Sequence, residues 1–112
     1  MREAADEGNA RALFEIGWMT YFGLGCRRSV SEARRLVETA VDRGILNTIT
    51  GESVTGNPYS QLRLGWLYDL GWGVEHSPYK AITWYTGAKI MGLRLADALI
   101  ARVSYGLSRS GT

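Results

Sequence analysis

Few residues of this chain could carry out chemistry, and their spacing favours none of the common reactions. The 112 residues include one cysteine, Cys26, and one histidine, His76. A cysteine nucleophile requires a nearby base such as histidine, but these two residues lie far apart in the sequence. His76 lacks a second metal ligand at a useful spacing, and no spacing of carboxylates favours acid–base catalysis. We therefore expect no catalytic residues, no metal and no cofactor.

A phosphate-binding loop is another kind of site to consider, because Gly71 and Gly73 are separated by a single residue. The dinucleotide-binding fingerprint follows a β-strand and ends with a third glycine. In this chain the third-glycine position holds His76, and the residues before Gly71 are predicted to form a helix. The glycines are therefore interpreted as structural.

The composition, with 46% hydrophobic and 21% charged residues, is that of an ordinary soluble globular chain. The net charge of +2 is too small to predict binding to nucleic acid or to an anionic membrane. No apolar run is long enough for a transmembrane helix, so we expect no membrane insertion. The N-terminal MREAADEG lacks the apolar segment of a secretory signal, and one cysteine cannot form an internal disulfide. These features favour the cytoplasm without fixing the compartment.

An internal repeat organises most of the sequence. When the chain is aligned with itself at an offset of 48 residues, residues 8–44 match residues 56–92 without a gap, and 10 of these 37 positions are identical. Chance would give about two or three identities. The identical positions are mostly glycine, alanine, serine and asparagine, which have distinct roles at helix ends and helix contacts.

Each repeat is predicted to be a helical hairpin. Asn9 and Asn57 suit the N-cap of the first helix, and Ser29 and Ser77 suit the N-cap of the second. A pair of glycines able to adopt positive φ ends each first helix, and a further glycine ends each second helix.

Small residues predict a close contact between the two helices of each hairpin. Gly17 and Gly65 lie inside the first helices, where glycine costs about 1 kcal/mol relative to alanine, so their repetition needs a packing reason. The second helices carry a matching row of small residues, spaced seven apart: Ala33, Ala40, Ala81 and Ala88.

The whole chain, residues 1–112, is interpreted as a single repeat domain with partial units at its ends. Its predicted parts are the end of a preceding helix (1–7), repeat one (8–44), an insert (45–55), repeat two (56–92) and a third first-helix (93–106). The insert is poor in helix formers and is expected to be a loop or a short β-hairpin. In the third copy of the first helix, Ala101 occupies the Gly17/Gly65 position.

The second repeat resembles a Sel1-like repeat, an α/α unit related to the tetratricopeptide repeat. The resemblance rests on Leu-Gly-x-x-Tyr-x-x-Gly-x-Gly-Val at residues 64–74, followed by Lys-Ala-x-x-Trp-Tyr-x-x-Ala-x-x-x-Gly at residues 80–92. The first repeat is similar but departs from the pattern: Thr20 replaces the tyrosine, Cys26 the valine, and residues 36–37 are Leu-Val instead of Trp-Tyr. With the flanking pieces, the resemblance covers nearly the whole chain apart from the insert.

The resemblance implies an all-α fold, a right-handed α/α solenoid of two Sel1-like helical hairpins with flanking partial units and one inserted loop. Its first helices would line a concave face. It also implies a non-catalytic scaffold or adaptor that binds a peptide or helix of another protein on that face. The alternative is a structural module that stacks on copies of itself as a homo-oligomer. A hydrolase is less favoured, because the Sel1-like proteins credited with that activity are rich in cysteine.

By analogy with tetratricopeptide repeats, the binding surface would use first-helix residues that point away from the helix–helix contact. Trp18 and Trp66 are the expected anchors because tryptophan is enriched in interfaces, although both could instead pack on a neighbouring helix. Trp72, in a turn, has the same two alternatives. The predicted partner-binding residues are Arg11, Phe14, Trp18, Tyr21, Phe22, Tyr59, Leu62, Trp66, Asp69 and Trp72.

Several other side chains receive structural interpretations. We expect Trp84 and Tyr85 in the core, Cys26 as a small buried apolar residue and His76 on the surface. A cluster of arginines in the first repeat is interspersed with acidic residues and is interpreted mainly as a self-paired, solvated face. An acidic partner is the alternative for this cluster, which comprises Arg27, Arg28, Arg34, Arg35 and Arg43.

Overall fold

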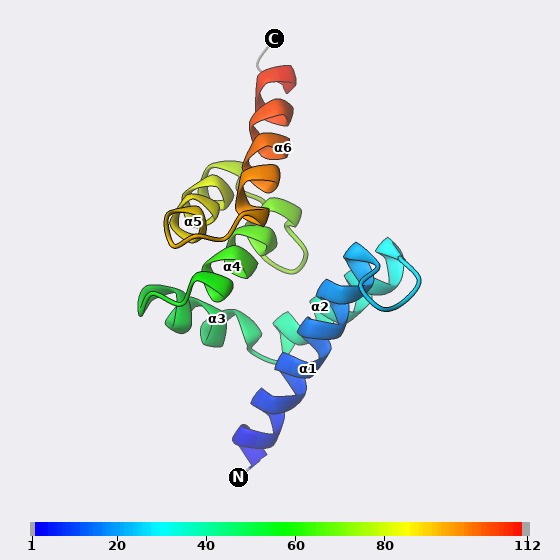
Figure 1. Ribbon diagram of the computed structural model, residues 1–112. Helices are drawn as coiled ribbons and strands as arrows, with labels where there is room; N and C mark the ends of the chain where they lie inside the picture. Colours follow the sequence, from blue (N-terminus) through cyan, green and yellow to red (C-terminus); the bar gives the residue numbers. More distant parts are fainter. Residues whose placement is uncertain (1, 111–112) are drawn as a thin grey trace. The chain divides into compact units, whose positions relative to one another are not determined.

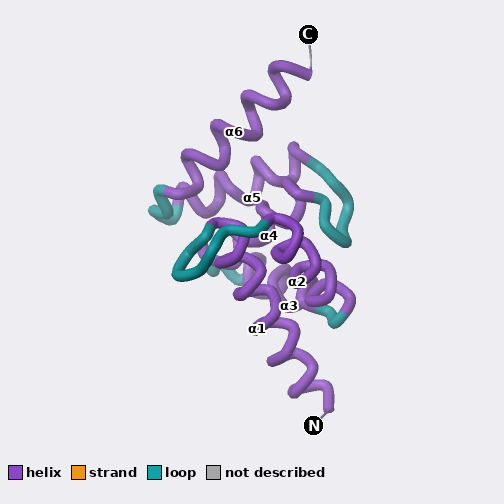
Figure 2. Tube along the Cα trace, turned by 90° about the vertical axis from the view of Figure 1, so that its right-hand side faces the viewer, coloured by secondary structure: helices purple, strands orange, loops and turns teal. Residues whose placement is uncertain are grey.

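The computed structural model describes residues 2–110 and the side chains of residues 8–109. This part of the chain forms helices joined by turns and loops, without a strand (Figures 1 and 2). The predicted all-α fold is confirmed. The helices are α1 (Arg2–Phe22), α2 (Val30–Asp42), α3 (Ile45–Val54), α4 (Pro58–Leu70), α5 (Pro78–Ile90) and α6 (Leu95–Ser110).

The chain divides into two compact units, Met1–Thr48 and Ile49–Thr112. The first unit contains the hairpin of α1 and α2. The second contains the hairpin of α4 and α5, with α6 packed against α5 (Figure 1). The boundary between the units falls within α3.

Side-chain caps set the start of three helices, as the sequence predicts. The Ser29 hydroxyl accepts a hydrogen bond from the backbone N–H of Glu32 over 3.2 Å, and Ser77 caps α5 in the same way over 3.3 Å. Asn57 Oδ1 accepts from the backbone N–H groups of both Tyr59 and Ser60. Each cap satisfies a donor that the first helical turn leaves unpaired.

The predicted N-cap at Asn9 is wrong, because α1 runs without interruption from Arg2 through Gly8 and Asn9. The difference from Asn57 lies in the next residue. Pro58 restricts Asn57 to extended backbone, with ψ of 112°, whereas the residue after Asn9 is alanine and leaves a helical conformation open. The predicted division at residue 7 is therefore not a helix end.

The expected loop at residues 45–55 is also wrong, since Ile45–Val54 form helix α3. Ile45, Ile49 and Ser53 are at most 1% exposed, and their spacing of four residues places them on one helical face. The Ser53 hydroxyl also donates a hydrogen bond to the Ile49 carbonyl oxygen over 2.8 Å. Burial of this face outweighs the weak helix propensity of its threonine and isoleucine residues.

Both hairpins have the close helix contact that the repeated glycines predict. A Cβ atom added at Gly17 would lie 2.8 Å from Val37 Cγ2, and one added at Gly65 would lie 2.6 Å from Tyr85 Cδ1. Neither position has room for a side chain without movement of its neighbour. The facing alanines are fully buried, namely Ala33, Ala40, Ala81 and Ala88.

The predicted third first-helix occurs as α6, which begins at Leu95 and continues to Ser110. Ala96, Leu99 and Val103 are at most 7% exposed and share one helical face. This face anchors α6 and leaves the neighbouring residues of the helix partly open to solvent.

Candidate functional site

Most of the predicted aromatic anchors lie in the interior of the structure. Phe14 and Trp66 are 0% exposed, and Trp18, Leu62 and Trp72 are at most 8% exposed. The rings of Trp66 and Trp72 meet edge to face, with their centroids 5.9 Å apart. These side chains therefore do not line an open groove. Trp18 and Trp66 pack in the interior, which is the alternative that the sequence left open.

The other predicted partner-binding residues are at least partly accessible. Tyr59 is 59% exposed, whereas Arg11, Tyr21, Phe22 and Asp69 are intermediate. Arg11, Tyr21 and Phe22 belong to the first compact unit, and Tyr59 and Asp69 belong to the second. Asp69, one of the predicted set, lines a pocket within the second unit.

A pocket of about 250 Å³ lies within the second unit, beside α6. Asp69 comes from the last turn of α4, His76 from the α4–α5 loop and Pro78 from the first turn of α5. One face of α6 completes it with Arg102, Val103, Gly106 and Leu107. We call this the α6 pocket. It combines an apolar wall with two charged side chains.

Two side chains, one from α5 and one from α6, donate hydrogen bonds to the Asp69 carboxylate in the α6 pocket. The Tyr85 hydroxyl donates a hydrogen bond to Asp69 Oδ2 over 2.9 Å, and the Arg102 guanidinium donates to the same oxygen. The Asp69 side chain is 13% exposed, whereas that of Arg102 is 47% exposed. Asp69 is thus mostly buried, whereas Arg102 lies at the surface and contacts it from there.

Burial raises the pKa of Tyr85, and the charge of Asp69 raises it further. Both causes act in the same direction, because each disfavours a phenolate at this position. Tyr85 therefore remains a neutral hydrogen-bond donor to Asp69 throughout the neutral range. The hydrogen bonds from Tyr85 and Arg102 thus hold the Asp69 carboxylate in place.

Sequence reasoning missed Arg102 and the rest of the α6 face. Arg102 pairs with a residue 33 positions away, and the sequence contains no local spacing that predicts such a contact. One signal was present. Because Ala101 aligns with Gly17 and Gly65, Arg102 stands where the first two copies have tryptophan.

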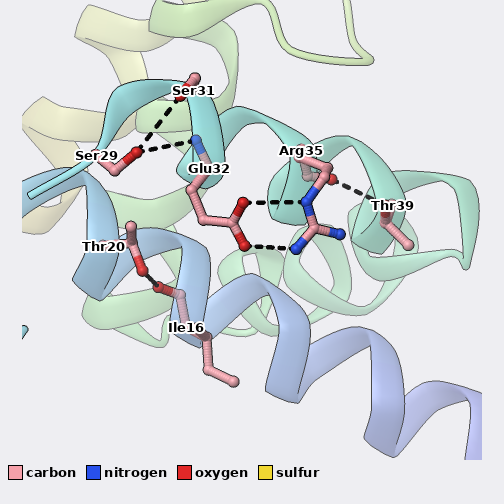
Figure 3. Close-up of polar contacts among 7 residues, drawn as sticks. All are labelled: Ile16, Thr20, Ser29, Ser31, Glu32, Arg35 and Thr39. Carbon is pink, nitrogen blue, oxygen red and sulfur yellow. Dashed lines mark hydrogen bonds and ion pairs between the residues drawn. The ribbon is translucent and has the colours of Figure 1, made fainter.

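Two of the five arginines in the cluster of the first repeat pair with neighbouring acids on α2. Arg35 forms two hydrogen bonds with the Glu32 carboxylate, which lower the pKa of Glu32 (Figure 3). Arg34 pairs with Glu38 over 3.2 Å. These exposed pairs contribute little to stability.

The isolated candidates for chemistry lie apart from any catalytic arrangement. Cys26 is exposed, so its predicted burial is wrong: it lies in the loop after α1, outside the helix contact. His76 is exposed and Tyr85 is fully buried, both as predicted, whereas Trp84, also predicted in the core, is partly exposed. Within the described residues, no group of three or more His, Cys, Asp or Glu side chains could hold a metal ion.

No helix within residues 2–110 is both long enough and apolar enough to cross a membrane.

The helical hairpins, with their buried glycine–alanine contacts, define an α/α repeat protein. The model of the Sel1 repeat matches residues 10–45 and 58–89, which together make up more than half of the chain. The chain therefore belongs to the Sel1 repeat family. Proteins of this family generally act as non-catalytic scaffolds for protein interactions.

Among solved structures, the chain is similar to a Sel1 repeat protein from Oxalobacter formigenes, known from a crystal structure. The two are 28% identical, and the match covers 90% of this chain and 67% of the other, with a TM-score of 0.40. No curated protein matches the sequence.

Proposed function

We propose that this Sel1 repeat chain is a non-catalytic adaptor that binds a segment of a partner protein in the α6 pocket. The observation that supports the proposal is the pocket itself, where an apolar wall and an exposed arginine converge on a partly buried carboxylate. Such a combination of apolar surface with a few placed polar groups is typical of recognition sites. Trp66, which is fully buried in α4, then stabilises one of the helices that shape the site.

The size of the α6 pocket favours a protein segment over a small-molecule ligand. Pockets for drug-sized ligands usually span about 300–1,000 Å³, and the α6 pocket is about 250 Å³. This space suits one anchoring side chain, with the neighbouring residues of the partner lying over α6. A single well-packed anchor supplies a large part of the affinity in many interfaces.

A large side chain introduced at a residue that lines the α6 pocket would fill it and test this proposal. A Cβ atom at Gly106 meets no atom within 4 Å, so Gly106→Trp places an indole in the pocket without a clash at the backbone. Gly51 in α3 is equally open, and Gly51→Trp is the matched control away from the pocket. Random peptides displayed on phage are selected against the wild-type chain and then tested on both variants.

We expect the selected peptides to bind the wild-type chain and Gly51→Trp alike and to lose binding to Gly106→Trp. Circular dichroism and thermal melting verify that both variants are folded. If the peptides bind Gly106→Trp as well as they bind the wild type, or if none is enriched, the α6 pocket is not the binding site.

Self-assembly is the second candidate function, supported by a different observation. Ile90, Met91 and Leu95 are 77%, 57% and 44% exposed where α5 ends and α6 begins. The corresponding positions of repeat one hold Asp42 and Arg43, so this apolar patch is specific to repeat two. Exposed apolar surface of this kind is typical of interaction sites.

Light scattering over a concentration series tests self-assembly. A mass that rises with concentration in the wild type and stays monomeric in Ile90→Asp/Met91→Arg would support it. The double substitution introduces the residues of repeat one, so it suits the fold of the hairpin. A constant monomeric mass in the wild type would exclude this candidate.

A further inference from the structure

We propose that the α6 pocket takes an aromatic side chain that carries a neutral hydrogen-bond donor, namely a tyrosine or tryptophan of the partner segment. The inference rests on the proposed function, because it names the chemistry of the anchor at the same site. It is supported by an acceptor atom in the pocket that the chain leaves unused, by the pairing of the charges there, and by the apolar wall.

The Asp69 carboxylate presents one oxygen atom that no described residue uses. The hydrogen bonds from Tyr85 and from Arg102 both end on Oδ2. Oδ1 accepts no hydrogen bond from the described residues, and solvent still reaches it. Since Asp69 lines the pocket, its Oδ1 is an acceptor available to a donor of the partner.

The formal charges at the pocket cancel in pairs, so neither a cationic nor an anionic side chain is favoured. Arg102 neutralises Asp69, and Glu75 in the α4–α5 loop pairs with Lys80 over 2.9 Å. A charged side chain would lose hydration on entering the pocket, and no net opposite charge would replace it. A neutral donor can bond to Oδ1 without that cost.

The rest of the lining favours a donor that is carried on an apolar ring. Pro78, Val103 and Leu107 supply apolar surface, and Gly106 adds no side chain to the wall. A cavity of about 150 Å³ holds one benzene molecule, so the α6 pocket, at about 250 Å³, has room for a phenol or an indole. Tyrosine and tryptophan combine such a ring with an O–H or N–H at its edge.

The first test uses the phage-selected peptides that fail to bind Gly106→Trp. We expect these peptides to share a tyrosine or a tryptophan, without enrichment of either charge beside it. In a synthetic peptide of this set, Tyr→Phe, or methylation of the tryptophan ring nitrogen, removes the donor and keeps the ring. Binding should weaken about tenfold, since a hydrogen bond to a charged acceptor is lost.

Asp69→Asn in the chain gives the reciprocal measurement. Tyr85 and Arg102 both donate at the Oδ2 position, so we expect the amide oxygen there and the amide NH₂ at the Oδ1 position. The variant thereby replaces the unused acceptor with a donor at nearly constant size. The tyrosine peptide should bind this variant about tenfold more weakly than the wild type, whereas its Tyr→Phe form should bind both alike.

Asp97→Asn is the matched control, because it removes an exposed acid of α6 that lies outside the pocket lining. It should change the affinity of neither peptide. Circular dichroism verifies that both variants are folded. If Asp69→Asn unfolds, the comparison of the tyrosine peptide with its Tyr→Phe form on the wild-type chain decides the question.

Three results would overturn the inference. These are pocket-dependent peptides that lack tyrosine and tryptophan, a Tyr→Phe change without loss of affinity, or an equal loss for both peptides in Asp69→Asn. In each of them the proposed site would stand, because binding would still depend on Gly106. If no selected peptide is sensitive to Gly106→Trp, the proposed function itself fails.

Discussion

Replacement of Gly65 by alanine measures how closely α4 and α5 approach each other. The new Cβ would lie 2.6 Å from Tyr85 Cδ1 and 3.0 Å from the Ala81 carbonyl oxygen. The Tyr85 ring is fully buried, and the carbonyl belongs to the backbone of α5, so neither can turn aside. The helices must separate, or the ring must leave its position.

The expected change in the free energy of unfolding combines two opposing terms. Alanine in place of glycine stabilises a helix interior by about 1 kcal/mol, and overpacking a core costs about 1–3 kcal/mol. Because both contacts are with groups that cannot yield, we take the upper end and expect a net loss of about 2 kcal/mol. For a small domain this lowers Tm by roughly 8–16 °C.

Gly106→Ala is the matched control, since its Cβ meets no atom within 4 Å. Only the gain in helix propensity applies there, and we expect a stabilisation of about 0.5–1 kcal/mol. The assay is urea and thermal unfolding followed by circular dichroism at 222 nm. If Gly65→Ala melted at or above the wild type, the close contact between α4 and α5 would be refuted.

Three further substitutions or reactions follow from the structure. The pKa of Tyr85 is raised in the folded state. Its contribution to stability is therefore present below the usual tyrosine pKa of about 10 and is lost as the pH rises above it. Urea unfolding at pH 9 and pH 11 should show that the free energy of unfolding falls less for Tyr85→Phe than for the wild type. Ser77→Ala should cost about 1 kcal/mol by removing the α5 cap, whereas Ser108→Ala, on the exposed part of α6, should change the unfolding midpoint little. Cys26 is exposed and should react with a thiol reagent at the same rate with and without denaturant; a reaction that begins only on unfolding would contradict its position.

The parts of the fold that the sequence predicts well are those set by neighbouring residues. Ser29 and Ser77 each cap a helix through a backbone N–H three residues ahead, so the pattern and its cause lie in one short segment. Gly17 and Gly65 were interpretable for a different reason. Their repetition against helix propensity indicated a tertiary contact, and both lie against the second helix of their hairpin.

The errors come from positions where local preference and tertiary structure disagree. Asn9 and Asn57 are the same residue type, but only Asn57 precedes a proline, and only there does the helix begin. Helix α3 forms from residues of poor propensity because one face, including Ile45 and Ile49, is buried. Burial of this kind is a property of the folded structure and could not be predicted from the segment alone.

The candidate site was less predictable than the fold, since the repeated tryptophans suit an interface and a core equally well. Trp18 and Trp66 are buried, whereas Asp69, another member of the predicted set, is partly accessible and lines the α6 pocket. Its two partners, Tyr85 and Arg102, come from other helices. No single segment contains the pattern that brings these three side chains together.

The departure of α6 from the repeat explains why a pocket forms there. Arg102 stands at the position that holds Trp18 and Trp66 in the earlier copies. The two indoles are at most 6% exposed, whereas the Arg102 side chain is 47% exposed and reaches the acid at the end of α4. An arginine at this position supplies hydrogen-bond donors where an indole would supply apolar volume. The same repeat position thus builds the core in two helices and a polar pocket wall in the third, and the exception to the repeat is where we expect the partner to bind.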